Sequence, residues 1–373
     1  PALIYASRYS DRLNQDAEAM NTATSTYFLR FDDASGRGIP NSSNYGTSSL
    51  LFGVDARGSL TINHGTSSVI KVGGIDLSST IANAVAVSGR YAYVGLNSVA
   101  GELRVVDITN PSAPEQMGTL DFSTAISSIA VSGRYAYVGL GASPNEFHVV
   151  DISNPKAPVS VGMITFPATI NSVAVSGRYA YIGLAATTNE LRIVDISNPL
   201  APLEVGALDV GGIQAIAVSG RYAYVGLASG SNEFRVIDIS NPSVPVQIGA
   251  MSITVSVNSV AVSGRYAYIG LASSLNQFRV IDISNPALPT RVSTIVFPAV
   301  INSVAVSGRY AYVGLGSSAN ELRVIDVSNP ILPVQVSQFD FGSAIGFLTI
   351  AGNYAYVAQG DTQEFAILGL GGA

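Results

Sequence analysis

The sequence predicts an all-β fold, a seven-bladed β-propeller of four-stranded blades with a small β-rich N-terminal extension. Two repeated phrases and one hydrophobicity pattern indicate it. The phrase Ser-Gly-Arg-Tyr-Ala-Tyr begins at Ser88 and occurs six times, with a degraded seventh copy at Ala351 and glycines 44 residues apart, once 43. A second phrase, of the pattern Leu/Phe-Arg-Val/Ile-Val/Ile-Asp-Ile-Ser-Asn-Pro, ends at six prolines from Pro111 to Pro330. Between them lie short β-branched and aromatic segments without a helical period.

Each repeat is predicted to form four strands, as the third copy illustrates. Its strands are expected at Asn171–Ser176, Tyr179–Leu184, Leu191–Ile196 and Leu203–Val210. Glycine, asparagine and proline separate them, and proline ends a strand because it lacks the N–H that a ladder requires. A repeat of this length with four strands has the size of a propeller blade.

The strands carry apolar side chains on both faces, which favours blades stacked around an axis. In the segment Tyr91–Leu96, one face has two tyrosines and a glycine, and the other has alanine, valine and leucine. A sheet covered on both faces lies between neighbouring sheets. A solenoid is the alternative, and it would need distinct capping repeats, which the sequence does not show clearly.

Closure of the ring is predicted from the two ends of the repeat region. The seventh copy stops at Phe365–Leu370 without a fourth strand, whereas residues 70–77 match the fourth-strand pattern and precede the first copy. A strand at 70–77 would therefore complete the last blade. The predicted domains are a propeller of residues 66–373 and an arm with a β-hairpin in residues 1–65.

The third-strand phrases carry a family resemblance. Leu103-Arg104-Val105-Val106-Asp107 and Leu191-Arg192-Ile193-Val194-Asp195 resemble the signature of the LVIVD-repeat family. The resemblance implies a β-propeller of the kind found mainly in bacterial and archaeal surface or secreted proteins, mostly of unassigned function. The seventh copy departs from the signature, with Ala366 and Gly369 in place of arginine and aspartate.

Composition argues against several classes of function. The net charge is −6, so a basic nucleic-acid-binding face is not expected. There is no cysteine, there are only two histidines, and no apolar run reaches the length of a membrane helix. We therefore expect no cofactor, no metal site, no membrane insertion and no enzymatic activity.

The repeated charges are predicted to be structural. Each full repeat has an arginine after the Ser-Gly turn and an aspartate before the Asn-Pro turn, such as Arg178 and Asp195. Each aspartate is expected to accept backbone N–H bonds near that turn, or to pair with an arginine of its own or a neighbouring blade. A cation-binding carboxylate ring is the functional alternative. His148, which replaces an arginine in the second repeat, is likewise predicted to be a structural residue.

Variation between the blades points to one face of the disc. The Ser-Gly-Arg and Asn-Pro turns share one face, called here the repeat face, and change little. The two other kinds of loop share the opposite face, the variable face, and differ from blade to blade, which is where a rigid scaffold usually carries function. A glycan or protein ligand could bind there, which makes a lectin-like propeller the alternative function. The candidate binding residues are Asn97, Asn145, Asn189, Asn232, Asn276, Asn320 and Asp361.

The N-terminal extension is too short to supply a core of its own, so it is expected to pack on another surface. The leading hypothesis is a non-enzymatic extracellular or cell-surface protein, a virion surface included, with a structural or adhesive role. It would form a homo-oligomer or polymer, or dock into a larger surface assembly, through the extension. The candidate assembly residues are Tyr5, Tyr9, Tyr27, Leu29, Phe31, Leu51 and Phe52.

Overall fold

The computed structural model divides into two compact units, Pro1–Thr66 and Ser67–Ala373. Every regular element in the described part of the chain is a β-strand. Of the candidate assembly residues, Leu51 and Phe52 lie in a described strand, and Tyr5, Tyr9, Tyr27, Leu29 and Phe31 lie outside the described residues. The structure describes residues 51–54, 60–63, 69–77, 81–97, 100–141, 146–228, 230, 232–272, 277–360 and 363–371.

The first unit contains one described hairpin. Strands β1 (Leu51–Val54) and β2 (Leu60–Asn63) pair antiparallel, with Leu51 opposite Asn63 and Val54 opposite Leu60. This two-stranded sheet has no third strand among the described residues.

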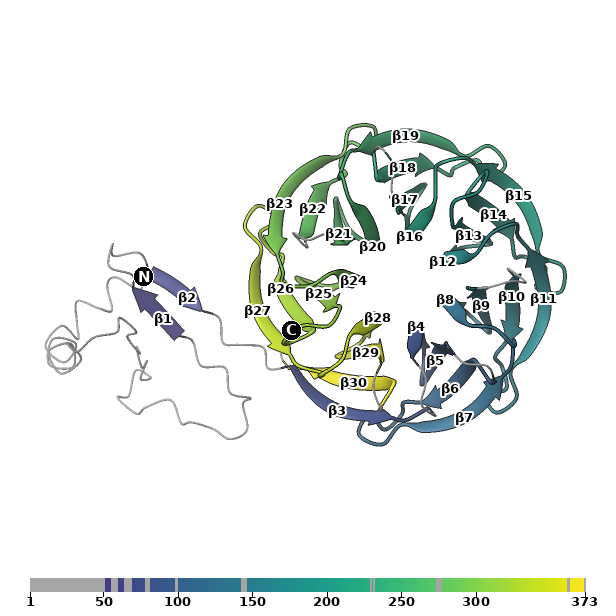
Figure 1. Cartoon of the computed structure of the whole chain (residues 1–373), viewed down its shortest axis with the longest axis horizontal. Helices are drawn as coiled ribbons and strands as arrows, with labels where there is room; N and C mark the ends of the chain where they lie inside the picture. The colour runs from purple at the N-terminus through teal and green to yellow at the C-terminus, as the bar shows by residue number, and fades with distance from the viewer. Residues whose placement is uncertain are drawn as a thin grey trace, which may run out of the picture. The chain divides into compact units, whose positions relative to one another are not determined.

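The second unit is a ring of seven four-stranded antiparallel sheets (Figure 1). The innermost strands are β4 (Ala82–Ser88), β8 (Ile126–Ser132), β12 (Ile170–Ser176), β16 (Ile213–Ser219), β20 (Ser256–Ser263), β24 (Ile301–Ser307) and β28 (Ile345–Ala351). The second strands are β5 (Tyr91–Leu96), β9 (Tyr135–Leu140), β13 (Tyr179–Leu184), β17 (Tyr222–Leu227), β21 (Tyr266–Ala272), β25 (Tyr310–Leu315) and β29 (Tyr354–Gln359).

The two outer positions of each sheet complete the blades. The third strands are β6 (Leu103–Asp107), β10 (Glu146–Asp151), β14 (Leu191–Asp195), β18 (Phe234–Asp238), β22 (Gln277–Asp282), β26 (Leu322–Asp326) and β30 (Phe365–Leu370). The outermost strands are β7 (Glu115–Leu120), β11 (Val159–Thr165), β15 (Leu203–Leu208), β19 (Val246–Met251), β23 (Thr290–Val296), β27 (Val334–Phe339) and β3 (Val69–Ile75). We number the blades 1 to 7 from the blade that begins with β4.

Six blades are continuous in sequence, and the seventh joins both ends of the ring. Strand β3 pairs antiparallel with β30, so that Val69 lies opposite Leu370 and Ile75 opposite Phe365. The sequence placed this strand at 70–77, but residues 76 and 77 lie beyond its end. The backbone N–H of Leu77 is instead donated to Glu364 Oε2 at 2.7 Å, which takes it out of the ladder.

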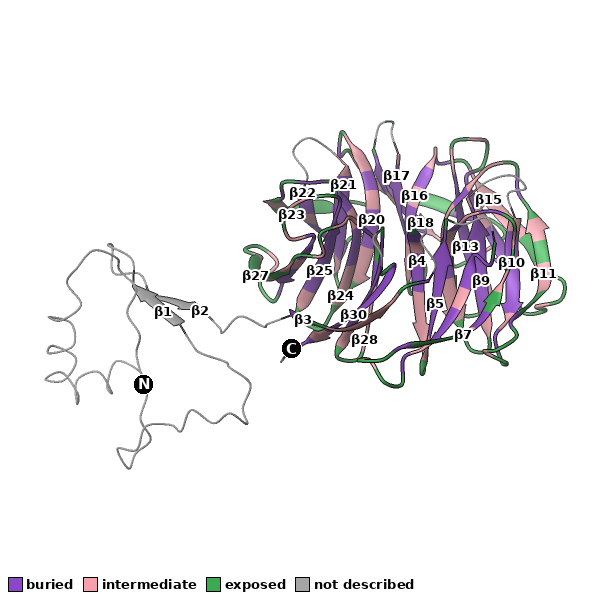
Figure 2. Ribbon diagram, turned by 60° about the horizontal axis from the view of Figure 1, so that its bottom comes forward, coloured by how far each residue is buried: buried purple, intermediate pink, exposed green. Residues whose placement is uncertain are grey.

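The hydrophobic core lies between the blades. Seven clusters of buried side chains each combine residues of two adjacent sheets. Buried residues line the second and third strands, and exposed residues gather in the loops and outer strands (Figure 2). In β5, Ala92, Val94 and Leu96 are fully buried, and Tyr93 on the other face is nearly so. The prediction that both faces of a blade are covered by neighbours is therefore confirmed.

The Asn-Pro turns of blades 1 to 6 each pack on the outer strand of the preceding blade. A Cβ added to Gly206 in β15 would lie 2.0 Å from the Pro242 carbonyl oxygen of blade 4. A Cβ added to Gly73 in β3 would likewise lie 2.0 Å from the Pro111 carbonyl oxygen of blade 1. In blade 5 the equivalent residue is Ser293 in β23, whose hydroxyl donates to the Pro330 carbonyl oxygen of blade 6 at 2.6 Å. The seventh blade uses the glycine contact to join the first.

Candidate functional site

The repeat face carries six Arg–Asp pairs, one in each of blades 1 to 6. In blade 3, Arg178 Nη2 donates to Asp195 Oδ2, and the N–H of Ser197 donates to Asp195 Oδ1 at 2.9 Å. The arginine and the serine together hold the pKa of Asp195 at about 2. The Arg178 guanidinium also lies 5.4 Å from the centroid of the Tyr179 ring.

These contacts recur in every full blade, which identifies them as part of the blade. Each aspartate accepts a backbone N–H two residues further on and pairs with the arginine of its own blade. The structural prediction for these charges is thus confirmed, with the pairing inside a blade rather than between blades. Among the described residues, no group of three His, Cys, Asp or Glu side chains is arranged to hold a metal ion.

Buried glutamates organise the loops of the variable face. Glu190 Oε2 accepts the N–H groups of Val210 at 3.0 Å and Gly211 at 2.9 Å, and Oε1 accepts that of Thr187 at 3.2 Å. Burial raises the pKa of Glu190, and the N–H bonds lower it. The effect of the bonds is the larger, so the pKa lies below its usual value and the carboxylate stays ionised. Four other glutamates make the corresponding bond to a backbone N–H: Glu102, Glu233, Glu321 and Glu364.

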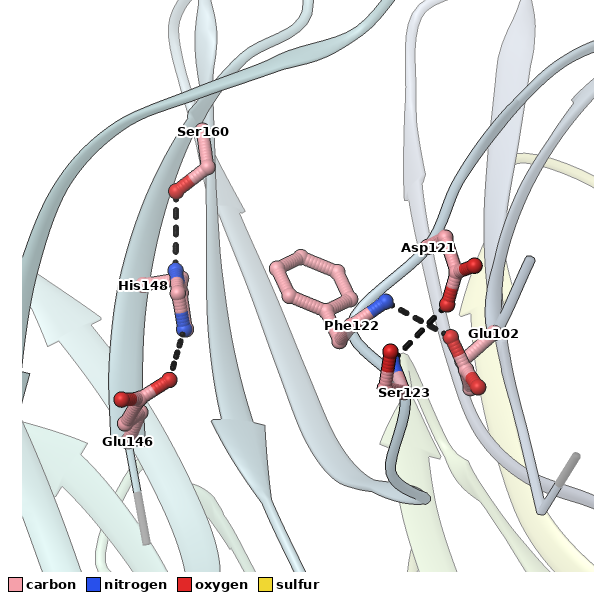
Figure 3. A network of polar contacts seen from close by, with 7 residues as sticks. All are labelled: Glu102, Asp121, Phe122, Ser123, Glu146, His148 and Ser160. Carbon is pink, nitrogen blue, oxygen red and sulfur yellow. Dashed lines mark hydrogen bonds and ion pairs between the residues drawn. The ribbon is translucent and has the colours of Figure 1, made fainter. Parts of the chain in front are cut away.

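In blade 2 the corresponding glutamate, Glu146, contacts the side chain of His148 (Figure 3). The ring Nδ1 lies 2.8 Å from Ser160 Oγ, and Nε2 lies 2.9 Å from Glu146 Oε2. The ring of Phe122, from the end of blade 1, meets His148 edge-on with centroids 4.8 Å apart. The side chains of Ser160, His148 and Glu146 therefore form a row containing the residue types of a hydrolytic triad.

The same position in blade 3 shows that this row follows from packing. Arg192 stands where His148 does, and its Nη1 donates to Glu204 Oε1 at 2.8 Å. Its guanidinium lies 6.0 Å from the centroid of Phe166, which ends blade 2 as Phe122 ends blade 1. Because arginine makes equivalent contacts without any nucleophile, His148 fills a structural slot at the junction between blades.

The candidate binding residues of the variable face have a conformational role where the structure describes them. Asn189, Asn232 and Asn320 adopt φ values of 57°, 63° and 64°. Asparagine tolerates this left-handed region better than most residues, so the turn itself accounts for the repeated asparagine. Asn97 is exposed at the end of β5, and Asn145, Asn276 and Asp361 lie outside the described residues.

A second candidate surface lies on the repeat face, in the two residues between the prolines of the Asn-Pro turns. Leu200 in blade 3 is 72% exposed, and Ile331 and Leu332 in blade 6 are 74% and 69% exposed. Val244 in blade 4 and Leu288 in blade 5 are also exposed. Sequence reasoning missed this surface because the turns were treated as uniform. Comparing the residues between the prolines locates the aliphatic side chains but does not show that they are exposed.

Comparisons with known proteins agree with this architecture. The family model described as LVIVD repeat matches residues 80–121, 125–165, 169–210, 211–252, 256–295, 301–340 and 346–368. No curated protein matches the chain. No helix among the described residues is long and apolar enough to cross a membrane.

Solved structures show the same fold at low sequence identity. The Cps50 (Swd1) β-propeller domain of Myceliophteria thermophila is 15% identical with a TM-score of 0.66, and the match covers 81% of this chain and 99% of that one. The computationally designed Ika8 protein is 12% identical with a TM-score of 0.59, covering 80% and 99%. BamB from Moraxella catarrhalis is 13% identical with a TM-score of 0.55, covering 81% and 96%.

Proposed function

The chain belongs to the LVIVD-repeat family, and from that premise we propose that it is a non-enzymatic propeller scaffold for protein contacts. Its place is extracellular or on a cell surface, and its role is structural or adhesive. It self-assembles, or docks into a larger surface assembly, through its N-terminal extension. No cofactor enters this proposal.

The observation that carries the proposal is that the propeller is complete without the extension. All seven sheets are built from strands between Val69 and Leu370. The remaining unit, Pro1–Thr66, contains the β1–β2 hairpin, and a two-stranded hairpin is marginally stable by itself. Unpaired strand edges accept another strand readily, so a partner surface would stabilise this unit.

The chemistry of the propeller favours binding over catalysis. Its repeated arginines, aspartates and glutamates are engaged in contacts that build each blade. The chain has few charged residues, 12% of the total. A rigid ring with varied loops is suited to present surfaces to partners.

The test compares the full chain with a chain that lacks residues 1–65, using size exclusion with light scattering over a range of concentrations. The full chain is expected to form species whose mass rises with concentration, and the shortened chain is not. A full-length chain that stays monomeric throughout, with its extension folded back on its own propeller, would refute the proposal.

A ligand-binding, lectin-like propeller is the second candidate, favoured by the variation of the loops on the variable face. Its test replaces Asn189, Asn232 and Asn320 by glycine, which keeps the positive φ and removes the amide. Saccharide binding on a glycan array that disappears in this variant supports the second candidate. Absence of binding by the native chain counts against it.

A further inference from the structure

The Asn-Pro turns have one backbone but two kinds of side chain. In blade 1 the residues between the prolines are Ser112 and Ala113, and in blade 6 they are Ile331 and Leu332. Both turns close with the same hydrogen bond, from Ala113 N–H to the Asn110 carbonyl at 3.0 Å and from Leu332 N–H to the Asn329 carbonyl at 3.1 Å. Since serine and alanine suffice for the turn, the aliphatic side chains of blade 6 serve another purpose than folding it.

The aliphatic turns are consecutive around the ring. Blades 3 to 6 each expose at least one large aliphatic side chain there, whereas blade 2 has Lys156 and Ala157. Each turn packs on the outer strand of the preceding blade, as Pro242 does on Gly206, so neighbouring turns belong to one surface. We call this surface the aliphatic arc, and its members are Leu200, Val244, Leu288, Ile331 and Leu332.

Exposed apolar side chains gathered on one surface mark an interaction site. Protein interfaces are depleted of charged residues at their centre, and the two residues between the prolines carry no charge in any of blades 3 to 6. Between its prolines the arc carries only aliphatic side chains, alanine and serine, and the lysine of the neighbouring blade 2 turn stands at its edge. A partner with matching apolar side chains would bury it.

The chain itself contains such a partner. Residues 1–50 precede the first described strand, and the arm at their start carries Leu3, Ile4, Tyr5, Tyr9 and Leu13 among polar residues. Each copy has one arm and one arc, which is the composition of a heterologous, head-to-tail contact. The variable face is a poorer partner, because its loops consist mostly of serine, alanine, threonine, asparagine and glycine.

We propose that the arm of one copy, residues 1–20, docks through its apolar side chains on the aliphatic arc of blades 3 to 6 of a second copy. The inference rests on the proposed assembly function and names the surface that receives the extension. Each copy then donates one arm and accepts another, so assembly continues until a ring closes or a filament grows.

The test removes the arc without changing the turn, by replacing its large aliphatic side chains with the serine or alanine found at the same positions in blade 1. The arc variant carries Leu200→Ser, Val244→Ala, Leu288→Ala, Ile331→Ser and Leu332→Ala in the full chain. Lys156→Ser in blade 2, outside the arc, is the matched control. A second variant with only Ile331→Ser and Leu332→Ala guards against misfolding, and thermal unfolding verifies the fold of each.

Self-association measured by analytical ultracentrifugation is expected to weaken by at least about a hundredfold in the arc variant and to stay unchanged in the control. The chain lacking residues 1–65 keeps the arc and lacks the arm. Mixing it with the arc variant is expected to give a complex of one copy of each that grows no further.

The outcomes separate the inference from the function on which it rests. An arc variant that assembles like the native chain overturns the inference and leaves assembly through the extension intact. A native chain that is monomeric overturns both. If the shortened chain still assembles and the arc variant does not, the arc binds another arc and the arm is the wrong occupant. The inference is also refuted if the arc variant and the chain lacking residues 1–65 form no complex when they are mixed.

Discussion

Blade 7 and the six continuous blades reach the same architecture with different side chains. Blades 1 to 6 are each one stretch of sequence, whereas blade 7 joins β28–β30 to β3 from the other end of the ring. Blade 7 has Asn353, Ala366 and Gly369 where blade 3 has Arg178, Arg192 and Asp195. It nevertheless forms the same four-stranded antiparallel sheet.

What blade 7 keeps shows what a blade requires. Tyr356 is buried and stacks on Phe365 with centroids 6.2 Å apart, as the tyrosine and phenylalanine of blades 2, 4 and 5 do. Glu364 keeps its bond to a loop N–H. The Leu370 N–H still donates to the Asn353 carbonyl at 2.9 Å, the bond that joins Ile196 to Arg178 in blade 3. The Arg–Asp pair therefore strengthens a turn that backbone bonds already form.

The junction from blade 7 to blade 1 also lacks two side-chain bonds found elsewhere. At the junction of blades 6 and 7, Asn302 Nδ2 donates to the Ile345 carbonyl at 2.8 Å, and Ser303 Oγ accepts the Leu348 N–H at 3.1 Å. The corresponding residues of blade 7 are Gly346 and Phe347. The closing junction thus depends on β3 and on apolar packing, without the two side-chain bonds that join blades 6 and 7.

Removing the closing strand β3 should destabilise the propeller more than any of the following substitutions. Deleting residues 66–78 removes the ladder to β30 and the buried Leu77. We expect a loss of at least about 5 kcal/mol in the free energy of unfolding, because a buried strand and its apolar cover are both lost. Chemical denaturation measures it. Unchanged unfolding would show that β3 does not hold the ring closed.

Glu364→Ala tests closure by a single contact. It leaves the Leu77 N–H without the carboxylate that accepts it, and we expect a loss of about 2–3 kcal/mol. Glu190→Ala in blade 3 is the matched control, since its partner Val210 lies in the same continuous repeat. Hydrogen exchange should show β3 fraying in the first variant, with no corresponding loss of β15 in the second. Equal protection of both strands would contradict the distinction.

Asp195→Ala makes blade 3 resemble blade 7 on the repeat face. It removes the acceptor of Arg178 and of the Ser197 N–H, and we expect a loss of about 1–2 kcal/mol. Thermal unfolding measures the change, and the assembly state should stay the same. Loss of assembly with unchanged stability would give this pair a functional role instead.

Acid should weaken the six blades with Arg–Asp pairs and spare the same face of blade 7. In the folded chain the pKa is about 2 for Asp107, Asp151, Asp195, Asp238 and Asp282, below the value of about 4 in an unfolded chain. Their stabilisation is present above pH about 4 and is lost as the pH falls through about 2. Asp195→Asn should flatten the dependence of unfolding on pH in this window, and an identical slope would contradict the assignment.

Asn302→Ala should have the smallest effect on stability, because it removes a single hydrogen bond between blades 6 and 7. The closing junction, which has Gly346 at this position, also lacks that bond. We expect a loss of about 0.5–1 kcal/mol, typical of one neutral hydrogen bond. Phe147→Leu in the core between blades 2 and 3, a cluster without residues of blades 6 or 7, serves as the reference for a general packing change. A loss above that of Glu364→Ala would mean that the innermost strands dominate the joining of blades.

The sequence predicted the repeat, the blade and most strand positions, because these depend on local chemistry. The second strand of blade 3 is Tyr179–Leu184, as predicted. Its fourth strand was predicted to end at Val210 and ends at Leu208. The reason is the bond from the Val210 N–H to Glu190, which removes the residue from the ladder. The same kind of contact, Leu77 with Glu364, ends β3 before its predicted limit.

The candidate site was less accessible from sequence. The repeated asparagines of the variable face were interpreted as binding residues, but the positive φ of Asn189 gives a local reason for that residue type. The aliphatic arc went unnoticed, since one leucine between two prolines says nothing about its exposure. Its significance comes from four turns brought side by side around the ring.

By itself, then, the sequence determined the strands, the turns and the number of blades, because period and turn chemistry act between residues close along the chain. Only the tertiary structure decided which glutamates are buried, that Arg178 pairs within its own blade, and that Ile331 and Leu332 lie exposed. These properties depend on what the neighbouring blades cover. Two turns with the same backbone, in blades 1 and 6, therefore differ in the surface that they offer to a partner.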